Sequence, residues 1–246
     1  MKIYVASDDA RSERLKTLCL QRGHQMPHHG PWNAVVLALP HSTMPEELTD
    51  ALPRGQCVIS GKPDAALEQL AKKRGWRMRY PLQDEDYLLK NAQLTAEGAV
   101  YAAMREAPFA ISGAKCLVIG YGRIGKALTR MLRALGADVI AAARKPESRL
   151  EAGGNSIAIE EIPKVLSSVQ LVFNTVPFPL VDRGALTHVP SETLLFELAS
   201  PPYGIDLAAA RELKLRCFLE SALPGRYCPD TAAQALLAYI EREESK

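Results

Sequence analysis

Short hydrophobic runs alternate along this chain with longer amphipathic stretches. The run at 33–39 is nearly continuous, as expected for a strand that is buried on both faces of a parallel sheet. Within the first 80 residues this pattern predicts strands at 2–6, 33–39, 57–61 and 76–80. Apolar residues at helical spacing predict helices at 9–22 and 64–74. Alternation of this kind predicts a small, flavodoxin-like α/β module.

The same alternation continues in the second half of the chain. A helix at 84–106 with one apolar face is expected to connect the two halves. Six strands then follow, with helices between most of them, which is the pattern of a doubly wound parallel sheet. The last helix, 230–244, is expected to fold back onto the first module. The strands are predicted at 115–120, 138–143, 156–159, 171–176, 193–199 and 216–219.

These elements predict an organisation in two α/β domains. We expect an N-terminal module at 1–107, a Rossmann domain at 108–228, and a C-terminal helical segment at 229–246 that packs on the N-terminal module. Ligands of such folds bind at the carboxyl ends of the strands. We therefore expect the cofactor and the substrate to bind where the two domains meet.

Three glycines follow the strand at 115–120 and open an amphipathic helix. Their spacing is G-x-G-x-x-G, the fingerprint of a dinucleotide-binding βαβ unit. The first glycine makes the turn, the second admits the pyrophosphate, and the third lets the helix pack on the strand. A tight turn without a ligand is the alternative, and the strand–helix–strand context favours the dinucleotide. The residues expected to hold it are Gly120, Gly122, Arg123, Ile124 and Gly125.

The end of the next strand indicates which dinucleotide binds. NAD-binding units usually carry an acidic residue there, for the ribose 2′-hydroxyl. This chain has Arg144 and Lys145 instead, and a guanidinium can hold a 2′-phosphate through two parallel hydrogen bonds. We therefore predict NADP(H). The alternative is that Arg144 is an ordinary solvated residue.

Composition excludes several classes of protein. The 246 residues are 47% hydrophobic and 24% charged, as in ordinary globular proteins. A net charge of +2 argues against a nucleic-acid or anionic-membrane partner. No apolar run reaches membrane-spanning length and the N-terminus does not resemble a signal peptide, so we expect a cytoplasmic protein. The histidines lack a cluster of cysteines or carboxylates, and no metal site is predicted.

Polar residues at two later strand ends are candidates for the site. The glycine motif first suggests a D-2-hydroxyacid dehydrogenase. That assignment fails, because Ser200 and Tyr227 stand near the positions where such an enzyme needs an arginine and a histidine. The residues that close the strand at 171–176 are expected to lie against the nicotinamide ribose: Asn174, Thr175, Val176 and Pro177.

Longer matches show that the chain resembles the family of dipicolinate synthase A subunits, from spore-forming bacteria. They extend through the whole sequence: Asp9-Ala10-Arg11, Leu39-Pro40 with Ser42, Ser60-Gly61, Thr95 with Glu97-Gly98, 120–125, Gly136-Ala137, Ala143-Arg144, Asn174-Thr175 with Pro177, Leu198-Ala199-Ser200 with Pro202, Gly204 and Asp206, and Leu223-Pro224-Gly225 with Pro229, Thr231-Ala232 and Gln234.

The resemblance implies an activity and a partner. It implies NADP-linked oxidation of a dihydro- or hydroxytetrahydro-pyridine dicarboxylate to dipicolinate during sporulation, together with a flavoprotein-like B subunit. A homo-oligomer is also compatible with the resemblance. Two features depart from the family: the module before residue 84 is shorter between its first two strands, and Glu197 stands where the family is expected to have Asp.

A cyclic dicarboxylate needs cationic or helix-terminal binding groups, and its oxidation needs a proton acceptor. Glu97 and Glu197 are the candidate acceptors, although a buried carboxylate satisfied by backbone N–H groups is the alternative for Glu197. Two rival functions remain: another NADP-dependent reductase, and a non-catalytic NADPH-binding subunit. The candidate substrate residues are Arg11, Ser42, Ser200, Gly225 and Arg226, and either arginine could instead be an ordinary surface residue.

Overall fold

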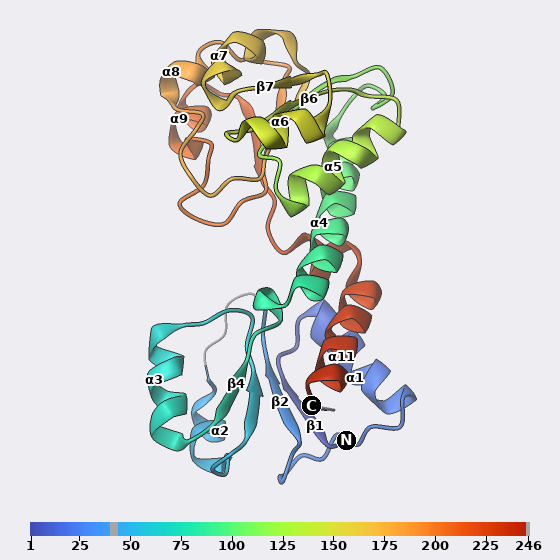
Figure 1. The fold of residues 1–246 in the computed structure, drawn as a ribbon, viewed down its shortest axis with the longest axis vertical. Coiled ribbons are helices and arrows are strands. Elements are labelled where there is room, and N and C mark those ends of the chain that lie inside the picture. The colour runs from blue at the N-terminus through green and yellow to red at the C-terminus, as the bar shows by residue number, and fades with distance from the viewer. Residues whose placement is uncertain (40–43, 245–246) are drawn as a thin grey trace. The chain divides into compact units, whose positions relative to one another are not determined.

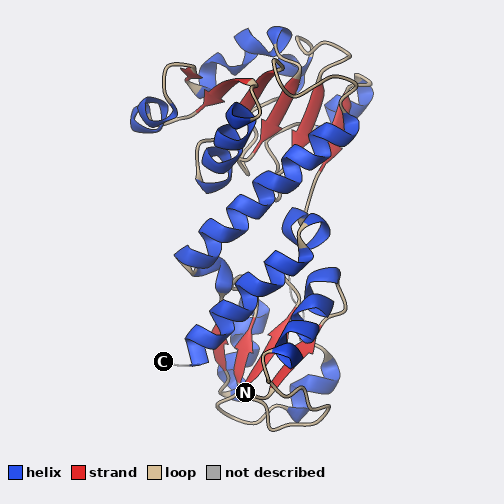
Figure 2. Ribbon diagram, turned by 90° about the vertical axis from the view of Figure 1, so that its right-hand side faces the viewer, coloured by secondary structure: helices blue, strands red, loops and turns tan. Residues whose placement is uncertain are grey.

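The chain forms two compact units in a computed structural model, which describes residues 1–39 and 44–244. One unit comprises Met1–Leu94 with Pro224–Lys246, and the other comprises Thr95–Leu223. Each contains a single parallel sheet with helices around it, so the α/β class is confirmed (Figure 2). Helix α4 (Glu85–Glu106) begins in the first unit and ends in the second. Ser42, a predicted substrate residue, lies outside the described residues.

The first unit is built on a four-stranded sheet. Its strands lie in the order β1-β2-β3-β4 and are all parallel. Strands β2 and β3 are buried along their whole length, and for β2 the continuous apolar sequence predicted this. The strands are β1 (Ile3–Ala6), β2 (Ala34–Leu37), β3 (Cys57–Ile59) and β4 (Arg77–Arg79).

Helices cover both faces of this sheet (Figure 1). Helices α1 (Ala10–Gln21) and α11 (Pro229–Glu244) share one apolar core with β1 and β2. Helices α2 (Glu46–Ala51) and α3 (Ala65–Arg74) share another core, on the opposite faces of β2 and β3. The return of the last helix to the first module is therefore confirmed. A short 3₁₀ turn, η1 (Pro81–Gln83), leads into α4.

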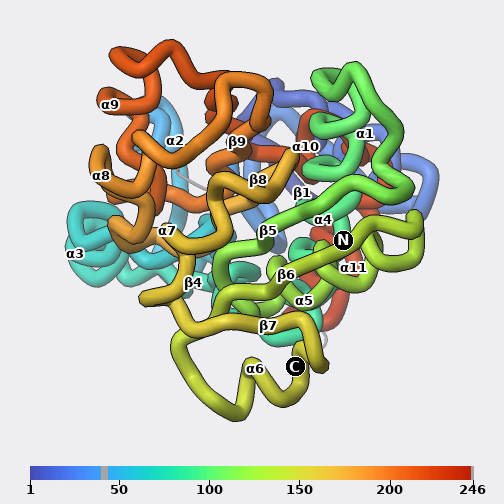
Figure 3. The backbone as a smooth tube through the Cα atoms, turned by 90° about the horizontal axis from the view of Figure 1, so that it is seen from above, coloured from blue at the N-terminus to red at the C-terminus, as the bar shows by residue number. Residues whose placement is uncertain are grey.

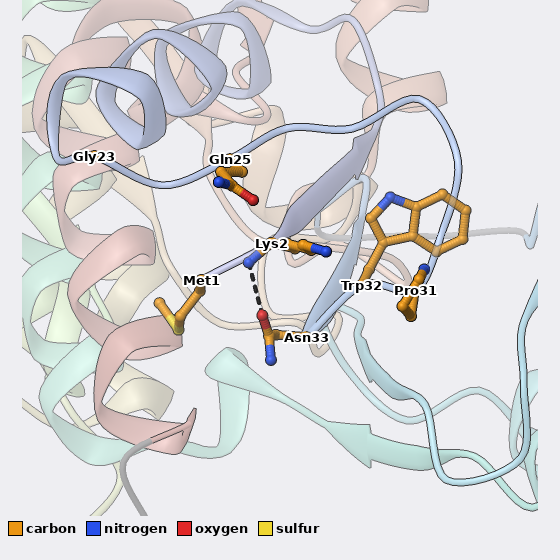
Figure 4. Close-up of a pocket in the computed structure, with 7 residues that line it drawn as sticks. All are labelled: Met1, Lys2, Gly23, Gln25, Pro31, Trp32 and Asn33. Atoms are coloured by element: carbon orange, nitrogen blue, oxygen red, sulfur yellow. Dashed lines mark hydrogen bonds between the residues drawn. The ribbon is translucent and has the colours of Figure 1, made fainter.

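A fifth strand is reduced to one residue. Gln25 forms an isolated parallel bridge with Lys2 on the outer side of β1 (Figure 4). The Ile3 N–H donates to the Gln25 carbonyl at 2.9 Å, and the Gln25 N–H donates to the Met1 carbonyl at 2.8 Å. If this bridge is counted as the second strand, the order becomes the 2-1-3-4-5 of flavodoxin. The order in which strands are added to the sheet then reverses between β1 and β2, although all the strands stay parallel. This explains why α1 and α2 lie on opposite faces of the sheet.

The second unit has the Rossmann strand order. Its sheet reads β10-β9-β8-β5-β6-β7, all parallel, with the reversal between β5 and β8 (Figure 3). The predicted strand at 156–159 is shorter than expected, because Ile159 already belongs to a 3₁₀ turn. The strands are β5 (Lys115–Ile119), β6 (Asp138–Ala142), β7 (Ser156–Ile157), β8 (Leu171–Asn174), β9 (Leu194–Glu197) and β10 (Arg216–Leu219).

Helix α5 (Arg123–Ala134) is the long helix of the second unit, and its buried residues pack on the sheet. The remaining helices are shorter, and all but the last of them, which follows β10, connect strands of this sheet. No helix within residues 1–39 and 44–244 has the length and apolar character needed to span a membrane. The short helices are α6 (Pro146–Ala152), η2 (Ile159–Glu161), α7 (Ile162–Val165), η3 (Leu166–Ser168), α8 (Arg183–Leu186), α9 (Leu207–Glu212) and α10 (Leu223–Tyr227).

Candidate functional site

Two of the three glycines in the turn between β5 and α5 leave no room for a side chain. Gly120 has φ +96°, which is left-handed backbone, and a Cβ there would lie 2.5 Å from Thr175 Oγ1. A Cβ on Gly125 would overlap the carbonyl oxygen of Gly120. The turn therefore holds α5 directly against the end of β5, as the fingerprint requires.

The middle glycine faces open space. A Cβ on Gly122 would have no other heavy atom within 4 Å. Gly122 is also the N-cap of α5, and no side chain caps this helix end. The positive end of the helix dipole is thus available to an anion. This cradle fits a dinucleotide pyrophosphate. Of the neighbouring predicted residues, Arg123 is exposed and Ile124 is half-buried.

The end of β6 presents two exposed cations. Arg144 and Lys145 directly follow buried alanines, and Lys145 is the N-cap of α6. The Arg149 side chain donates to the carbonyls of Ala143 and Arg144 at 2.9 Å each, which fixes the backbone of this turn. Among the described residues, neither the Arg144 nor the Lys145 side chain forms an ion pair or hydrogen bond. Both cations are therefore available to an anionic ligand.

The polar residues at the end of β8 are engaged inside the protein. Asn174 is completely buried, and its NH₂ group donates to Val176 O at 2.9 Å and to Glu197 Oε1 at 2.7 Å. Its carbonyl oxygen accepts from Val176 N at 3.2 Å. The Thr175 hydroxyl donates to Ile119 O at 2.9 Å. These side chains therefore shape the turn, and Val176 and Pro177 form its more exposed part.

Glu197, at the end of β9, is a fully buried carboxylate. Besides Asn174, it accepts hydrogen bonds from the N–H groups of Ala199, Gly204 and Ile205, each at 2.9 Å. This is the satisfied buried arrangement that the sequence left open as an alternative. Gly204 was singled out only as part of the match to the family and was given no role, although a Cβ there would overlap the Asn174 amide.

Two other predicted residues of the second unit are exposed. Glu97 lies on an exposed position of α4, and Ser200 lies in the turn after β9. The structure therefore brings Asn174, Thr175 and Glu197 together around the glycine turn, and leaves the side chain of Ser200 outside that network.

Arg11 occupies a different kind of environment, in the first unit. It is only 7% exposed, at the start of α1, where the chain leaves the carboxyl end of β1. Its Nη2 donates to Leu39 O at 2.7 Å, and its guanidinium lies near the Tyr87 hydroxyl. Its Nε is buried without a hydrogen-bond partner in the described structure. Burial raises the pKa of Tyr87, and the neighbouring Arg11 opposes this increase. Nothing in the sequence distinguished Tyr87 beforehand.

The last two substrate candidates follow the second unit. A Cβ on Gly225 would lie 3.7 Å from Arg11 Cβ, so Gly225 is a neighbour of Arg11. Arg226 is exposed; its guanidinium lies 4.9 Å from the centre of the Tyr227 ring and donates to the Tyr227 hydroxyl at 3.0 Å.

One cavity of the first unit lies at the other end of its strands. A pocket of about 480 Å³ is formed by residues that precede β1 and β2, among them Lys2, Trp32 and Asn33 (Figure 4). It lies at the amino-terminal ends of the strands, whereas ligands of open α/β sheets bind at the carboxyl ends. We therefore do not assign it to the reaction. The described residues contain no cluster of three or more metal-binding side chains.

Comparison with known proteins identifies relatives of both units. The model of the NAD-binding domain of D-isomer specific 2-hydroxyacid dehydrogenases matches residues 87–195. This match supports a nicotinamide dinucleotide cofactor and an oxidoreductase. The A subunit of dipicolinate synthase from Bacillus subtilis (strain 168) is 30% identical over 207 residues, which cover 80% of this chain and 70% of the relative.

Solved structures share the fold. The dipicolinate synthase A subunit from Bacillus halodurans superimposes with a TM-score of 0.88 at 24% identity, over 100% of this chain and 98% of that one. The corresponding dipicolinate synthase chain from Bacillus subtilis gives 0.83 at 22% identity, over 100% and 97%. The apo structure of D-lactate dehydrogenase from Escherichia coli gives 0.66 at 16% identity, over 100% and 97%.

Proposed function

Because this chain belongs to the family of dipicolinate synthase A subunits, we propose that it oxidises a dihydro- or hydroxytetrahydro-pyridine dicarboxylate to dipicolinate with NADP⁺. Membership of the family and the matched dehydrogenase domain make it an NAD(P)-dependent oxidoreductase. The substrate, the choice of NADP and the partner are the parts that we propose.

The proposed reaction removes two electrons from the ring. A dihydro-pyridine dicarboxylate loses one hydride and one proton and becomes aromatic; the hydroxytetrahydro form also loses water. The bound nicotinamide supplies the hydride acceptor. The protein must then hold the two carboxylates and accept the proton. We retain Glu97 as the proposed proton acceptor, because it carries a carboxylate at an exposed position of α4.

The observation that carries the cofactor assignment is the end of β6. It has two exposed cations without protein partners in the described structure, and no carboxylate for a ribose 2′-hydroxyl. A 2′-phosphate gives Arg144 a bidentate partner and adds a second attraction from Lys145. An NAD ribose would leave both cations unused. These contacts support NADP(H), as the sequence predicted.

The proposed carboxylate-binding group is Arg11. A buried guanidinium with an unpaired N–H group and no carboxylate partner among the described residues is costly, unless a ligand compensates it. Arg11 also stands at the strand reversal of the first sheet, where ligands of such folds bind. Gly225 adjoins Arg11 without a side chain that would obstruct a ligand. Ser42, Ser200 and Arg226 remain proposed substrate residues on the resemblance alone.

We extend the proposal to a partner and a setting. The relative is named as one lettered subunit of its enzyme, which implies a second. The flavoprotein-like nature of that partner, a homo-oligomeric state, a cytoplasmic location and a role in sporulation are further parts of the proposal, based on the resemblance.

The deciding experiment is oxidation of a freshly generated dihydrodipicolinate precursor with NADP⁺, with and without a B subunit. NADPH and dipicolinate are followed together, and equal rates of appearance are expected. Replacing NADP⁺ by NAD⁺ tests the cofactor assignment. Measurable NADPH binding with no dipicolinate under either condition would contradict the proposal and favour another reductase or a non-catalytic NADPH-binding subunit.

A further inference from the structure

The carboxylate of Glu197 connects two strand ends of the second unit. Its Oε1 accepts from Asn174 Nδ2 at 2.7 Å and from Ala199 N at 2.9 Å. Its Oε2 accepts from Gly204 N and Ile205 N, both at 2.9 Å. Each oxygen therefore has two donors. The donors to Oε1 come from the end of β8 and the start of the turn after β9, and the donors to Oε2 come from the far end of that turn.

The connection continues to the glycine turn. The Asn174 carboxamide binds both the N–H and the carbonyl of Val176. Val176 Cγ2 lies so close to Gly120 that a Cβ there would be 2.6 Å away. Glu197 thus fixes Asn174, Asn174 fixes Val176, and Val176 covers the first glycine of the dinucleotide cradle.

This environment is unsuited to proton transfer with a substrate. Glu197 is 0% exposed, and its four accepted hydrogen bonds occupy both oxygens. No cation pairs with it in the described part of the chain. The four N–H donors occupy both oxygens and leave neither directed at a ligand.

We propose that Glu197 is a positioning residue, which holds Asn174 and the Thr175–Val176 turn in the shape that binds the nicotinamide dinucleotide. The inference rests on the proposed cofactor-dependent function and replaces the expectation that Glu197 accepts a proton. It concerns the protein's own residues around the cradle and is independent of which acid is oxidised.

Gly204 provides a second route to the same network. A Cβ on Gly204 would overlap the Nδ2 and lie 2.7 Å from the Oδ1 of Asn174. The change Gly204→Ala therefore displaces Asn174 while the carboxylate remains. By contrast, Glu197→Gln keeps the shape but turns one acceptor oxygen into a donor that faces other donors. The two substitutions therefore disturb the same contact, between Asn174 and Glu197, in chemically different ways.

The test compares Glu197→Gln, Gly204→Ala, the double variant and Glu192→Gln. Glu192 is exposed five positions before Glu197, so it serves as a matched control. NADPH affinity is measured by fluorescence titration, the fold by circular dichroism, and kcat against pH by turnover. We expect each single variant to bind NADPH about tenfold more weakly or worse. We expect the double variant to lose much less than the two effects combined, because both act on one network.

A proton-transfer role gives a different pattern. Glu197→Gln would then keep wild-type NADPH affinity, lose kcat and lose one limb of the pH profile, and this result would overturn the inference. Wild-type affinity and turnover in Glu197→Gln would overturn it as well. If that variant fails to fold, a folded Gly204→Ala protein with wild-type affinity decides against the inference. The affinity measurements remain valid even if wild-type protein forms no dipicolinate, so failure of the proposed reaction is a separate result.

Discussion

The guanidinium of Arg11 donates to the carbonyl oxygen of Leu39 across 2.7 Å and so joins the first turn of α1 to the chain just after β2. Asp9 caps the same helix by accepting from Ser12 N at 3.1 Å. The two contacts fix Arg11 at the strand reversal of the first sheet. There it can meet a ligand carboxylate without first having to be ordered, which lowers the entropic cost of binding.

Replacing Arg11 tests this role. Arg11→Met removes the charge and leaves Leu39 O without its donor, so we expect about 1–3 kcal/mol less stability in urea unfolding. We expect dipicolinate to bind at least about tenfold more weakly by calorimetry, while NADPH affinity is unchanged. Arg14→Met is the control, because Arg14 lies on the same helix and pairs with Asp230 at the surface. Undiminished dipicolinate affinity in a folded Arg11→Met protein would exclude the assignment.

Charge reversal at Arg144 tests the choice of cofactor. Arg144→Glu replaces an attraction to the 2′-phosphate by a repulsion, so NADPH affinity is expected to fall about 100-fold while NADH affinity changes little. Arg130→Glu is the control, since Arg130 is an exposed arginine on α5. Both affinities are measured by fluorescence titration at two salt concentrations. An equal loss for the two cofactors would show that Arg144 does not contact the 2′-phosphate.

The glycines of the cradle are predicted to differ in what they tolerate. Gly122→Val adds a side chain in open space, so the protein should keep its stability but lose dinucleotide binding. Gly125→Ala forces a clash with the Gly120 carbonyl and should lower the thermal midpoint itself. Gly154→Ala is a neutral control, because its Cβ would meet nothing within 4 Å. Full NADPH affinity in Gly122→Val would place the dinucleotide elsewhere.

Buried thiols predict how stability changes at alkaline pH. Burial raises the pKa of Cys116 from 9.0 to about 12, and burial together with the nearby Glu197 raises that of Cys217 to about 12. The unfolded chain releases these protons near pH 9, while the folded protein retains them. Their contribution to stability is therefore complete below pH 9 and is lost as the pH rises toward 12.

The measurement is the urea midpoint at pH 8, 9.5 and 10.5. The midpoint is expected to fall across this series, and Cys116→Ala should show a smaller fall than wild-type protein. Equal slopes for the two proteins would mean that the Cys116 thiol ionises alike in the folded and unfolded chains.

The long elements and the glycine turn could be predicted because their signals are local. Strands such as β5 are continuous apolar runs, and α5 has helical periodicity over three turns. Helices of one turn, such as α8, have no period to detect, although the Asp182 that caps α8 is a local signal. The bridge at Gln25 also escaped prediction, since a single paired residue leaves no pattern in the sequence.

The sequence indicates which positions contribute to the candidate site better than it indicates which hydrogen bonds their side chains form. Asn174 and Glu197 are polar residues at strand ends, and the sequence marks them as such. Which way they face depends on the turn from Ala199 to Ile205, whose N–H groups converge on one carboxylate only in the folded protein. Likewise, Arg11 lies beside Tyr87, which is distant in sequence, so the local sequence does not reveal its environment.

The reduced strand at Gln25 leaves one edge of the first sheet nearly open. In the described structure β1 pairs outward with this residue alone, and an unpaired edge can recruit a strand from another molecule. The loop beside it opposes such growth, because Pro27 and Pro31 have no N–H to donate and Lys2 adds an exposed charge. Replacement of these three residues by β-branched ones would leave the edge of β1 open to pairing with another molecule and so favour aggregation.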